Sequence, residues 1–189
     1  MTPIKLSLDL QRQEVIKHLL SLDKEDLRLR FGYTPTDSII EKYVTDTWNT
    51  DGNRWFGIYH PEFDGVVGTL HVAQMKDDTA EFGFTVDKRL RGKGYGDALF
   101  KRGMLWAKAR MVKHIFMHCL SENKIIQHIA KKNGMHVVRL MGGEAEADLV
   151  VPKDYSAPYS EAMVDNLAIY DMLLVNQQKM LATLFRKTS

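Results

Sequence analysis

Residues 86–96 read Val-Asp-Lys-Arg-Leu-Arg-Gly-Lys-Gly-Tyr-Gly and carry more information about the fold than any other stretch. A run with alternating apolar residues, 80–86, precedes them, and a helical pattern follows from Asp97 to Val112. A strand that leads through a glycine-rich turn into a helix creates an anion site, because the first helical amides lack partners and the helix dipole is positive there. We therefore expect a phosphate group, in a pyrophosphate, to bind at this turn.

The residue types in the turn support a phosphate ligand. Gly92, Gly94 and Gly96 allow positive φ angles and a close approach of the ligand to the backbone. Positive charge is contributed by four side chains: Lys88, Arg89, Arg91 and Lys93. A P-loop is excluded because no Lys-Ser or Lys-Thr follows Gly96, and a dinucleotide fingerprint starting at Gly92 would need glycine where Asp97 stands.

The pattern Arg-x-x-Gly-x-Gly-x-Gly, from Arg89 to Gly96, resembles motif A of the GNAT superfamily of N-acetyltransferases, in which the loop holds the pyrophosphate of acetyl-CoA. A second segment strengthens the resemblance. Asn123 follows an apolar run, and Gly134 and Met135 stand eleven and twelve positions later, as in GNAT domains. Together the two segments cover about residues 55–140.

The resemblance implies an α/β (α+β) fold of the GNAT type, with a central mixed, twisted sheet of six or seven strands flanked by helices. The strands that carry residues 84–86 and 115–119 would be parallel and would splay apart beside the pantetheine arm. We expect residues 1–155 to form the acetyltransferase domain. Residues 156–189 would form a C-terminal helical extension.

The resemblance also implies the co-substrate and its site. Acetyl-CoA would be held by Phe84, Val86, Arg91, Gly92, Lys93, Gly94, Tyr95, Gly96, Asn123 and Ala130. In protein-lysine acetyltransferases of Pat type, a glutamate preceded by alanine stands at the start of the strand before the loop, as Glu81 does here. Glu81 is thus the candidate general base; alternatively, it is only a strand residue that faces solvent. In that case Asp78 or Asp77, just upstream, would be the candidate base.

The acceptor is the least determined part of the resemblance. Many small-molecule GNAT enzymes carry a tyrosine acid where this chain has Ala130, so we assign no general acid. This difference favours a protein lysine as acceptor, with a polyamine or an antibiotic amine as the alternative. Glu144, Glu146 and Asp148 form an acidic patch that either is a solvated surface or attracts a cationic amine. A non-catalytic acyl-CoA-binding regulatory module is the remaining alternative.

Composition is consistent with a single domain without a nucleic-acid or membrane partner. The 189 residues are 44% hydrophobic and carry a net charge of +2, too mild for a polyanion binder. No apolar run approaches eighteen residues and no leader opens the chain, which predicts a cytoplasmic protein. Cys119 is expected to be buried and reduced. We expect no metal site, because His114 and His118 would lie about 13 Å apart along a strand.

Periodicity predicts the remaining elements. We expect strands at 5–8, 55–59, 66–73, 137–141 and 148–151, the second and third forming a hairpin, and helices at 11–20, 37–48, 124–133 and 160–186. Residues 26–31 are ambiguous between strand and helical turn.

The last helix has a heptad-like apolar seam: Met163, Leu167, Tyr170, Leu174, Gln177, Leu181 and Leu184. Either this helix packs over the sheet, or it forms a homodimer contact, because a helix that is apolar all round needs two surfaces to bury it.

Overall fold

The computed structural model describes residues 1–76 and 78–187, and one mixed sheet of seven strands lies at its centre. The strand order is β1-β2-β3-β4-β5-β7-β6. The strands are β1 (Ile4–Leu6), β2 (Asn53–Tyr59), β3 (Val66–Gln74), β4 (Thr79–Val86), β5 (His114–Leu120), β6 (His136–Arg139) and β7 (Glu144–Val150). The expected α/β architecture, with its mixed sheet and long C-terminal helix, is confirmed.

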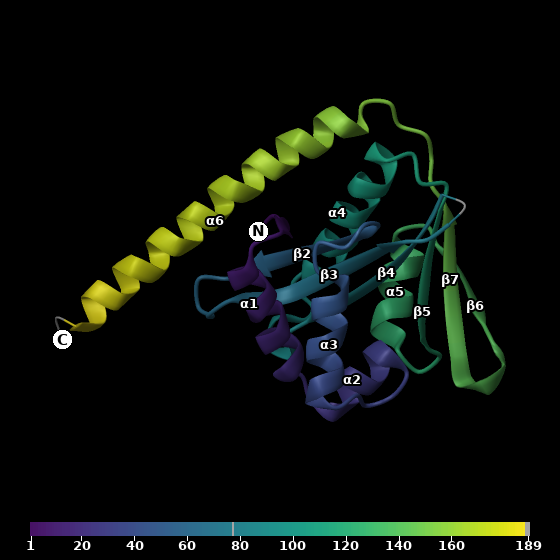
Figure 1. Cartoon of the computed structure of the whole chain (residues 1–189), viewed down its shortest axis with the longest axis horizontal. Helices are drawn as coiled ribbons and strands as arrows, with labels where there is room; N and C mark the ends of the chain where they lie inside the picture. The colour runs from purple at the N-terminus through teal and green to yellow at the C-terminus, as the bar shows by residue number, and fades with distance from the viewer. Residues whose placement is uncertain (77, 188–189) are drawn as a thin grey trace.

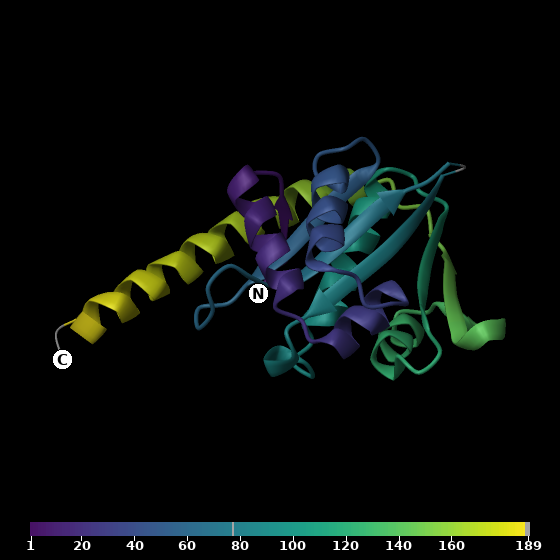
Figure 2. The same ribbon diagram turned by 60° about the horizontal axis from the view of Figure 1, so that its bottom comes forward.

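Helices cover both faces of this sheet (Figures 1 and 2). They are α1 (Asp9–Leu20), α2 (Lys24–Phe31), α3 (Asp37–Thr47), α4 (Tyr95–Ala109), α5 (Lys124–Lys132) and α6 (Ala157–Lys187). Alternate residues of β4 form the core under α4, where the ring of Phe82 lies 5.9 Å from that of Phe100. The opposite face of β4 meets the first helices, and His18 of α1 bonds to Thr85. The face that a β4 residue points to therefore decides which helices it contacts.

The two central strands part after a short parallel ladder. Pairing between β4 and β5 begins at Thr79 opposite His114 and ends at Glu81 opposite Phe116. Beyond Glu81, β4 continues its antiparallel pairing with β3, while β5 pairs along its whole length with β7. The expected parallel pair is confirmed, and the gap between its strands opens toward the glycine-rich turn.

The ambiguous residues 26–31 belong to helix α2. The side chain of Asp23 caps its first turn by accepting a hydrogen bond of 2.9 Å from the amide of Asp26, and Gly32 ends the helix with φ of 81°. These end signals decide the conformation more strongly than the short apolar pattern between them.

Most other boundaries differ from expectation by one to four residues. The first strand ends at Leu6 instead of residue 8, because the side chain of Gln11 accepts hydrogen bonds from the amides of Ser7 and Leu8 and starts α1 early. Strand β7 begins at Glu144, four residues before the expected start, because Glu144 pairs with Leu120 at the end of β5. Cross-strand pairing here overrides the low strand preference of glutamate.

Helix α6 lies across the molecule and its C-terminal part extends beyond the sheet (Figure 1). Its inner side carries small, apolar and charged residues: Ala157, Ala168 and Val175 are buried, and Arg102 of α4 pairs with Glu161 and Asp165. The predicted seam faces outward, with Leu167 56% exposed. No helix in the described part of the chain is both long and apolar enough to cross a membrane.

Candidate functional site

A cavity of ≈ 510 Å³ occupies the gap between β4 and β5. Its walls come from α2, the two parted strands, the glycine-rich turn, the first residues of α4 and the whole length of α5. Eight of the residues expected to hold a co-substrate line it: Phe84, Val86, Arg91, Gly92, Gly94, Tyr95, Gly96 and Asn123. Lys93 and Ala130 do not line it; Lys93 is exposed on the turn, whereas Ala130 is fully buried on the side of α5 that faces the core.

The glycine-rich turn presents bare backbone to this cavity. Gly92 and Gly94 have φ angles of 74° and 85°, and a Cβ built on either would meet nothing within 4 Å. Gly94 is the N-cap of α4. Within the described chain, the amides of residues 92–97 donate no hydrogen bond to another protein group. The turn is therefore an open cradle of positive φ glycines and available amides, which suits phosphate oxygens.

Gly96 has a different role from the other two glycines. A Cβ at this position would lie 2.7 Å from Cδ1 of Ile129 in α5. The absence of a side chain thus allows the start of α4 to approach the second half of α5 along one wall of the cavity.

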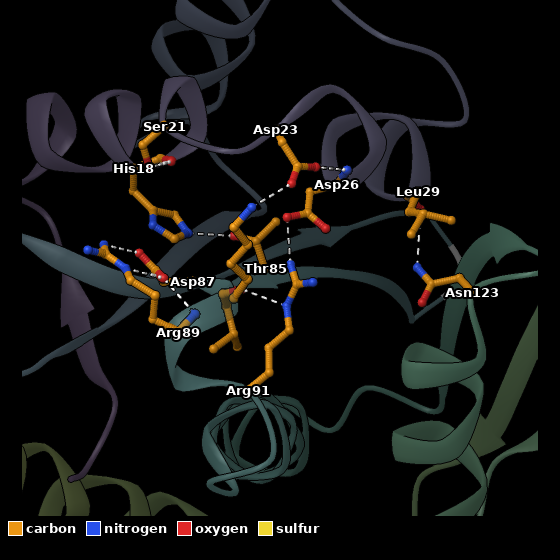
Figure 3. Close-up of polar contacts among 12 residues, drawn as sticks. His18, Ser21, Asp23, Asp26, Leu29, Thr85, Asp87, Arg89, Arg91 and Asn123 are labelled. Carbon is orange, nitrogen blue, oxygen red and sulfur yellow. Dashed lines mark hydrogen bonds and ion pairs between the residues drawn. The ribbon is translucent and has the colours of Figure 1, made fainter.

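The basic residues of the turn are mostly engaged with acids (Figure 3). Arg91 pairs with Asp26 of α2 at 2.7 Å, and its Nε donates to the carbonyl of Val86 at 3.2 Å. Arg89 donates two side-chain hydrogen bonds to Asp87, and these lower the pKa of that carboxyl to about 2. Lys88 pairs with Asp23 at 3.1 Å. Of the four cations, Arg91 alone lines the cavity, so the amides carry more of the anion-binding capacity than the sequence indicated.

Asn123 joins two walls of the cavity. Its Oδ1 caps α5 by accepting from the amide of Ile126 at 3.2 Å, and its Nδ2 donates to the carbonyl of Leu29 in α2 at 3.4 Å (Figure 3). The side chain is 7% exposed. In this structure Asn123 holds α5 and α2 together beside the cavity.

Cys119 was expected to be buried, and this was wrong. It is only partly buried and lines the cavity, because β5 has separated from β4 at this point and leaves the side chain uncovered. Partial burial still raises the pKa of the thiol. The apolar strand pattern could not reveal where the neighbouring strand ends.

Glu81 lies beside the cavity, where the two strands begin to part. Its Oε1 is 3.3 Å from Nδ1 of His118, and Nε2 of His118 is 2.9 Å from Oε2 of Glu146 on β7. The three side chains share one face of the sheet and are each partly exposed. His118 lines the cavity and links it to both carboxylates. Sequence reasoning missed this cluster, although the parallel register, once known, brings His118 beside Glu81.

The fallback acids lie elsewhere. Asp78 sits in the turn between β3 and β4, pairs with Lys113 at 2.9 Å, and does not line the cavity; Asp77 lies outside the described residues. The three residues of the acidic patch have different surroundings. Glu146 contacts His118, Asp148 lies 3.5 Å from His136, and Glu144 is exposed. Within the described chain, no three His, Cys, Asp or Glu side chains gather as metal ligands would.

Helix α2 contributes side chains that the sequence reading left unassigned. Asp26, Leu29 and Arg30 all line the cavity. The sequence did contain signals for this helix. The capping residue Asp23 is followed by two acidic residues in the first turn, and Gly32 stands directly after the last helical residue. Nothing local showed that the helix would pack against the gap between β4 and β5.

Comparisons with known proteins agree on the fold. The family described as "Acetyltransferase (GNAT) domain" matches residues 10–136. The GNAT domain of S. lividans PAT superposes with a TM-score of 0.67 at 17% identity, covering 78% of this chain and 88% of that one. No curated protein matches the chain in sequence.

Two further similar structures contain the co-substrate or its product. A phosphinothricin acetyltransferase from Sinorhizobium meliloti in complex with AcCoA has a TM-score of 0.65 at 12% identity, with 82% of this chain and 92% of that one covered. RimL, a ribosomal L7/L12 alpha-N-protein acetyltransferase in complex with coenzyme A, has a TM-score of 0.63 at 14% identity, with coverages of 82% and 97%.

Proposed function

Because the chain belongs to the GNAT acetyltransferase family and is thereby an acyltransferase, we propose that it transfers the acetyl group of acetyl-CoA to a primary amine, with Glu81 as base. One observation carries this proposal. The gap between β4 and β5 has a cradle of available amides at one end and the Glu81 carboxylate at the other. We propose that the reaction takes place in the cytoplasm.

The proposed donor site follows the cavity from the turn inward. The open amides of residues 92–97 would receive the pyrophosphate, and the edge of β4 that β5 leaves uncovered, at Phe84 and Val86, would bond the pantetheine arm. Arg91, Tyr95 and Asn123 line the same cavity. Lys93 would reach the phosphates from the exposed side of the turn, and buried Ala130 would support the wall from beneath.

The reaction is a direct displacement at the thioester. The neutral amine attacks the carbonyl carbon, so that an N–C bond forms while the C–S bond breaks and its electron pair leaves with the sulfur. The nitrogen must lose one proton, and in this proposal the carboxylate of Glu81 accepts it. An ionised carboxylate can only accept hydrogen bonds, so the contact with His118 holds Glu81 in place when that nitrogen carries hydrogen.

Replacing Glu81 by glutamine tests the base and the non-catalytic alternative together. We expect Glu81→Gln to keep its affinity for CoA and to lower CoA release in a thiol assay by roughly two to four orders of magnitude. Glu41→Gln, on the exposed side of α3, is the matched control and should keep wild-type turnover. Wild-type rates in Glu81→Gln across pH 6 to 9 would remove Glu81 from the mechanism, whereas CoA binding without turnover in the wild type would favour a regulatory module.

We propose a protein lysine as the acceptor, on the sequence grounds given by Ala130 and residues 80–82, with a small amine as the second candidate. The similar structures include a ribosomal-protein enzyme and a phosphinothricin enzyme, so the fold accommodates acceptors of both sizes. Labelled acetyl-CoA, incubated with a cytosolic extract and separately with a library of small amines, distinguishes them. Label confined to small molecules would exclude the protein-lysine acceptor and leave acetyl transfer standing.

We further propose that the extension at residues 156–189 pairs with the same helix of a second copy. The large apolar residues of the described seam are exposed: Met163 67%, Leu167 56%, Tyr170 66%, Leu174 56%, Leu181 46% and Leu184 60%. This strip of exposed apolar side chains, interrupted by Gln177, is typical of a surface that binds another protein. Its spacing of four and three residues matches a helix of equal spacing, which a second copy supplies.

A further inference from the structure

The last turn of α2 places the guanidinium of Arg30 directly against β4. A Cβ at Gly83 would overlap this guanidinium, so glycine at this position is what makes room for it, and both residues line the cavity. Arg30 is partly buried, yet no carboxylate within residues 1–76 and 78–187 pairs with it. Arg28, on the same helix, pairs with Glu25 and Glu122 instead. Arg30 is thus a charged group held in the cavity wall without a counterion.

A hydrogen-bond chain from the core fixes the guanidinium in this position. Nη2 of Arg30 donates to the hydroxyl of Tyr43 at 3.1 Å, and this hydroxyl lies 2.7 Å from Nδ1 of His71. Nε2 of His71 lies 2.8 Å from Oδ1 of Asn53. Burial lowers the pKa of His71 to about 3, so the ring is neutral, and the chain is satisfied when Tyr43 donates to Nδ1 and Nε2–H donates to Asn53.

One hydrogen bond leaves most of the guanidinium uncommitted. Arginine has five N–H donors arranged in a rigid fork that matches a carboxylate, and a single one is used by Tyr43. The ring of Phe31 lies beneath the group, 5.0 Å from Cζ. A positioned, partly desolvated fork with open donors is a recognition group for a planar anion.

The position of Arg30 relative to Glu81 indicates which molecule carries that anion. Glu81 and Gly83 point to the same face of β4, because side chains alternate along a strand, and their Cα atoms are about 7 Å apart. The guanidinium over Gly83 therefore lies next to the place where the amine would lose its proton. The phosphate cradle is at the other end of the cavity, at residues 92–97.

We propose that Arg30 binds a carboxylate carried by the amine acceptor. The inference rests on the proposed function, since it takes Glu81 as the amine end of the site. A free amino acid offers such a carboxylate beside its amine, and an acidic residue beside an acceptor lysine offers it within a peptide. The acceptor is in either case a carboxylate-bearing amine, drawn to the site by Glu81 and Glu146 at one end and Arg30 at the other.

Product analogues test this binding without requiring turnover. Calorimetry with CoA-loaded protein would compare N-acetyl amino acids with their α-amides, and peptides containing Nε-acetyl-lysine flanked by aspartate with peptides flanked by asparagine. We expect the carboxylate member of one pair to bind about 10- to 100-fold more tightly, the range for a hydrogen bond to a charged group. The pair that shows the difference identifies the source of the carboxylate.

Substitutions then assign the preference to a residue. Arg30→Gln should abolish the difference within the pair, and Arg30→Lys, which keeps the charge on an unforked group, should retain part of it. Arg28→Gln is the matched control, because it removes the same charge from the same helix at a side chain directed to Glu25 and Glu122. Circular dichroism verifies that each variant is folded.

Equal affinities within every pair, or a preference that persists in Arg30→Gln, would overturn the proposal. A loss of turnover in Arg30→Gln that is equal for charged and uncharged acceptors, with no change in affinity, would also overturn it and assign Arg30 to the thioester carbonyl. Failure of acetyl transfer is separate: it would appear as absent CoA release in wild-type protein that still prefers the carboxylate ligands.

Discussion

Glu81 and His118 meet where β4 and β5 part, with Oε1 of the first 3.3 Å from Nδ1 of the second. His118 also contacts Glu146 at 2.9 Å through its other nitrogen. Ionised carboxylates donate no hydrogen bond, so both contacts are hydrogen bonds only when both ring nitrogens carry hydrogen. The ring of His118 thus connects Glu81 to a second carboxylate, that of Glu146.

If Glu81 is the base, as proposed, His118 acts as its positioning residue, and removal of His118 should lower kcat. We expect His118→Gln to reduce kcat by roughly tenfold, less than the loss for Glu81→Gln, with unchanged CoA affinity. Steady-state kinetics and calorimetry measure the two quantities. His136→Gln is the control, because His136 also neighbours a carboxylate, Asp148, but lies on β6, which two strands separate from the strand of Glu81. A purely structural His118 would change thermal stability and leave kcat intact.

Gly94→Val should abolish CoA binding. The substitution adds a branched side chain to the cradle at a φ of 85°, where the cavity is open, so it obstructs the phosphate position. Gly142→Val is matched in backbone strain, since Gly142 has a φ of 84° and a Cβ there also meets nothing within 4 Å, but it lies in the turn before β7. Calorimetry should find CoA binding in Gly142→Val and none in Gly94→Val; equal binding in both would relocate the phosphate site.

Stability should fall on acidification between pH 6.5 and pH 4. Burial lowers the pKa of His18 to about 4 and that of His71 to about 3. Below pH 6.5 the unfolded chain binds protons at both rings that the folded chain does not, so the free energy of unfolding decreases by about 3 kcal/mol per histidine at pH 4.

Urea unfolding at pH 7 and pH 4 measures this loss. His18→Gln should show a smaller difference between the two pH values than the wild type, because its contribution no longer titrates. His136→Gln, at an exposed histidine, should show the full wild-type difference. The interpretation fails if His18→Gln and the wild type lose the same stability.

Charge placed on the outer seam of α6 should separate the proposed dimer. Leu167→Glu combined with Leu174→Glu puts two carboxylates on side chains that are each 56% exposed, so the folding of one chain is spared while pairing is opposed. Sedimentation velocity should show a dimer for the wild type and a monomer for this variant. Asn176→Glu adds charge to the same helix outside the seam and should remain dimeric. A monomeric wild type would contradict the proposal.

The fold was predictable because its signals are local. The glycines at 92–96 lie next to a strand and a helix in sequence, and the paired residues of the β2–β3 hairpin are joined by a short turn. The boundaries of β7 were not predictable, because Glu144 and Glu146 become strand residues only through pairing with β5.

The site was predictable only where its residues are neighbours in sequence. The turn amides could be anticipated from residues 86–96 alone. The contact of Arg30 with Gly83 could not, because it depends on α2 packing over β4, and the contact of His118 with Glu81 depends on a parallel register of only three residue pairs. The acids that engage Arg91 and Lys88 also come from α2, whose position the sequence left open.

The early end of the β4–β5 ladder has a kinetic consequence. A sheet normally separates its two sides, but here the strands leave a gap beyond Glu81, lined by α4 and α5 on one side and by α2 on the other. For the proposed acetyl transfer, we therefore expect donor and acceptor to enter from opposite sides and to be bound at the same time. Initial-rate plots should intersect, and CoA should compete with acetyl-CoA but not with the amine. Parallel plots would instead indicate an acetylated protein intermediate. In that case CoA would leave before the amine binds.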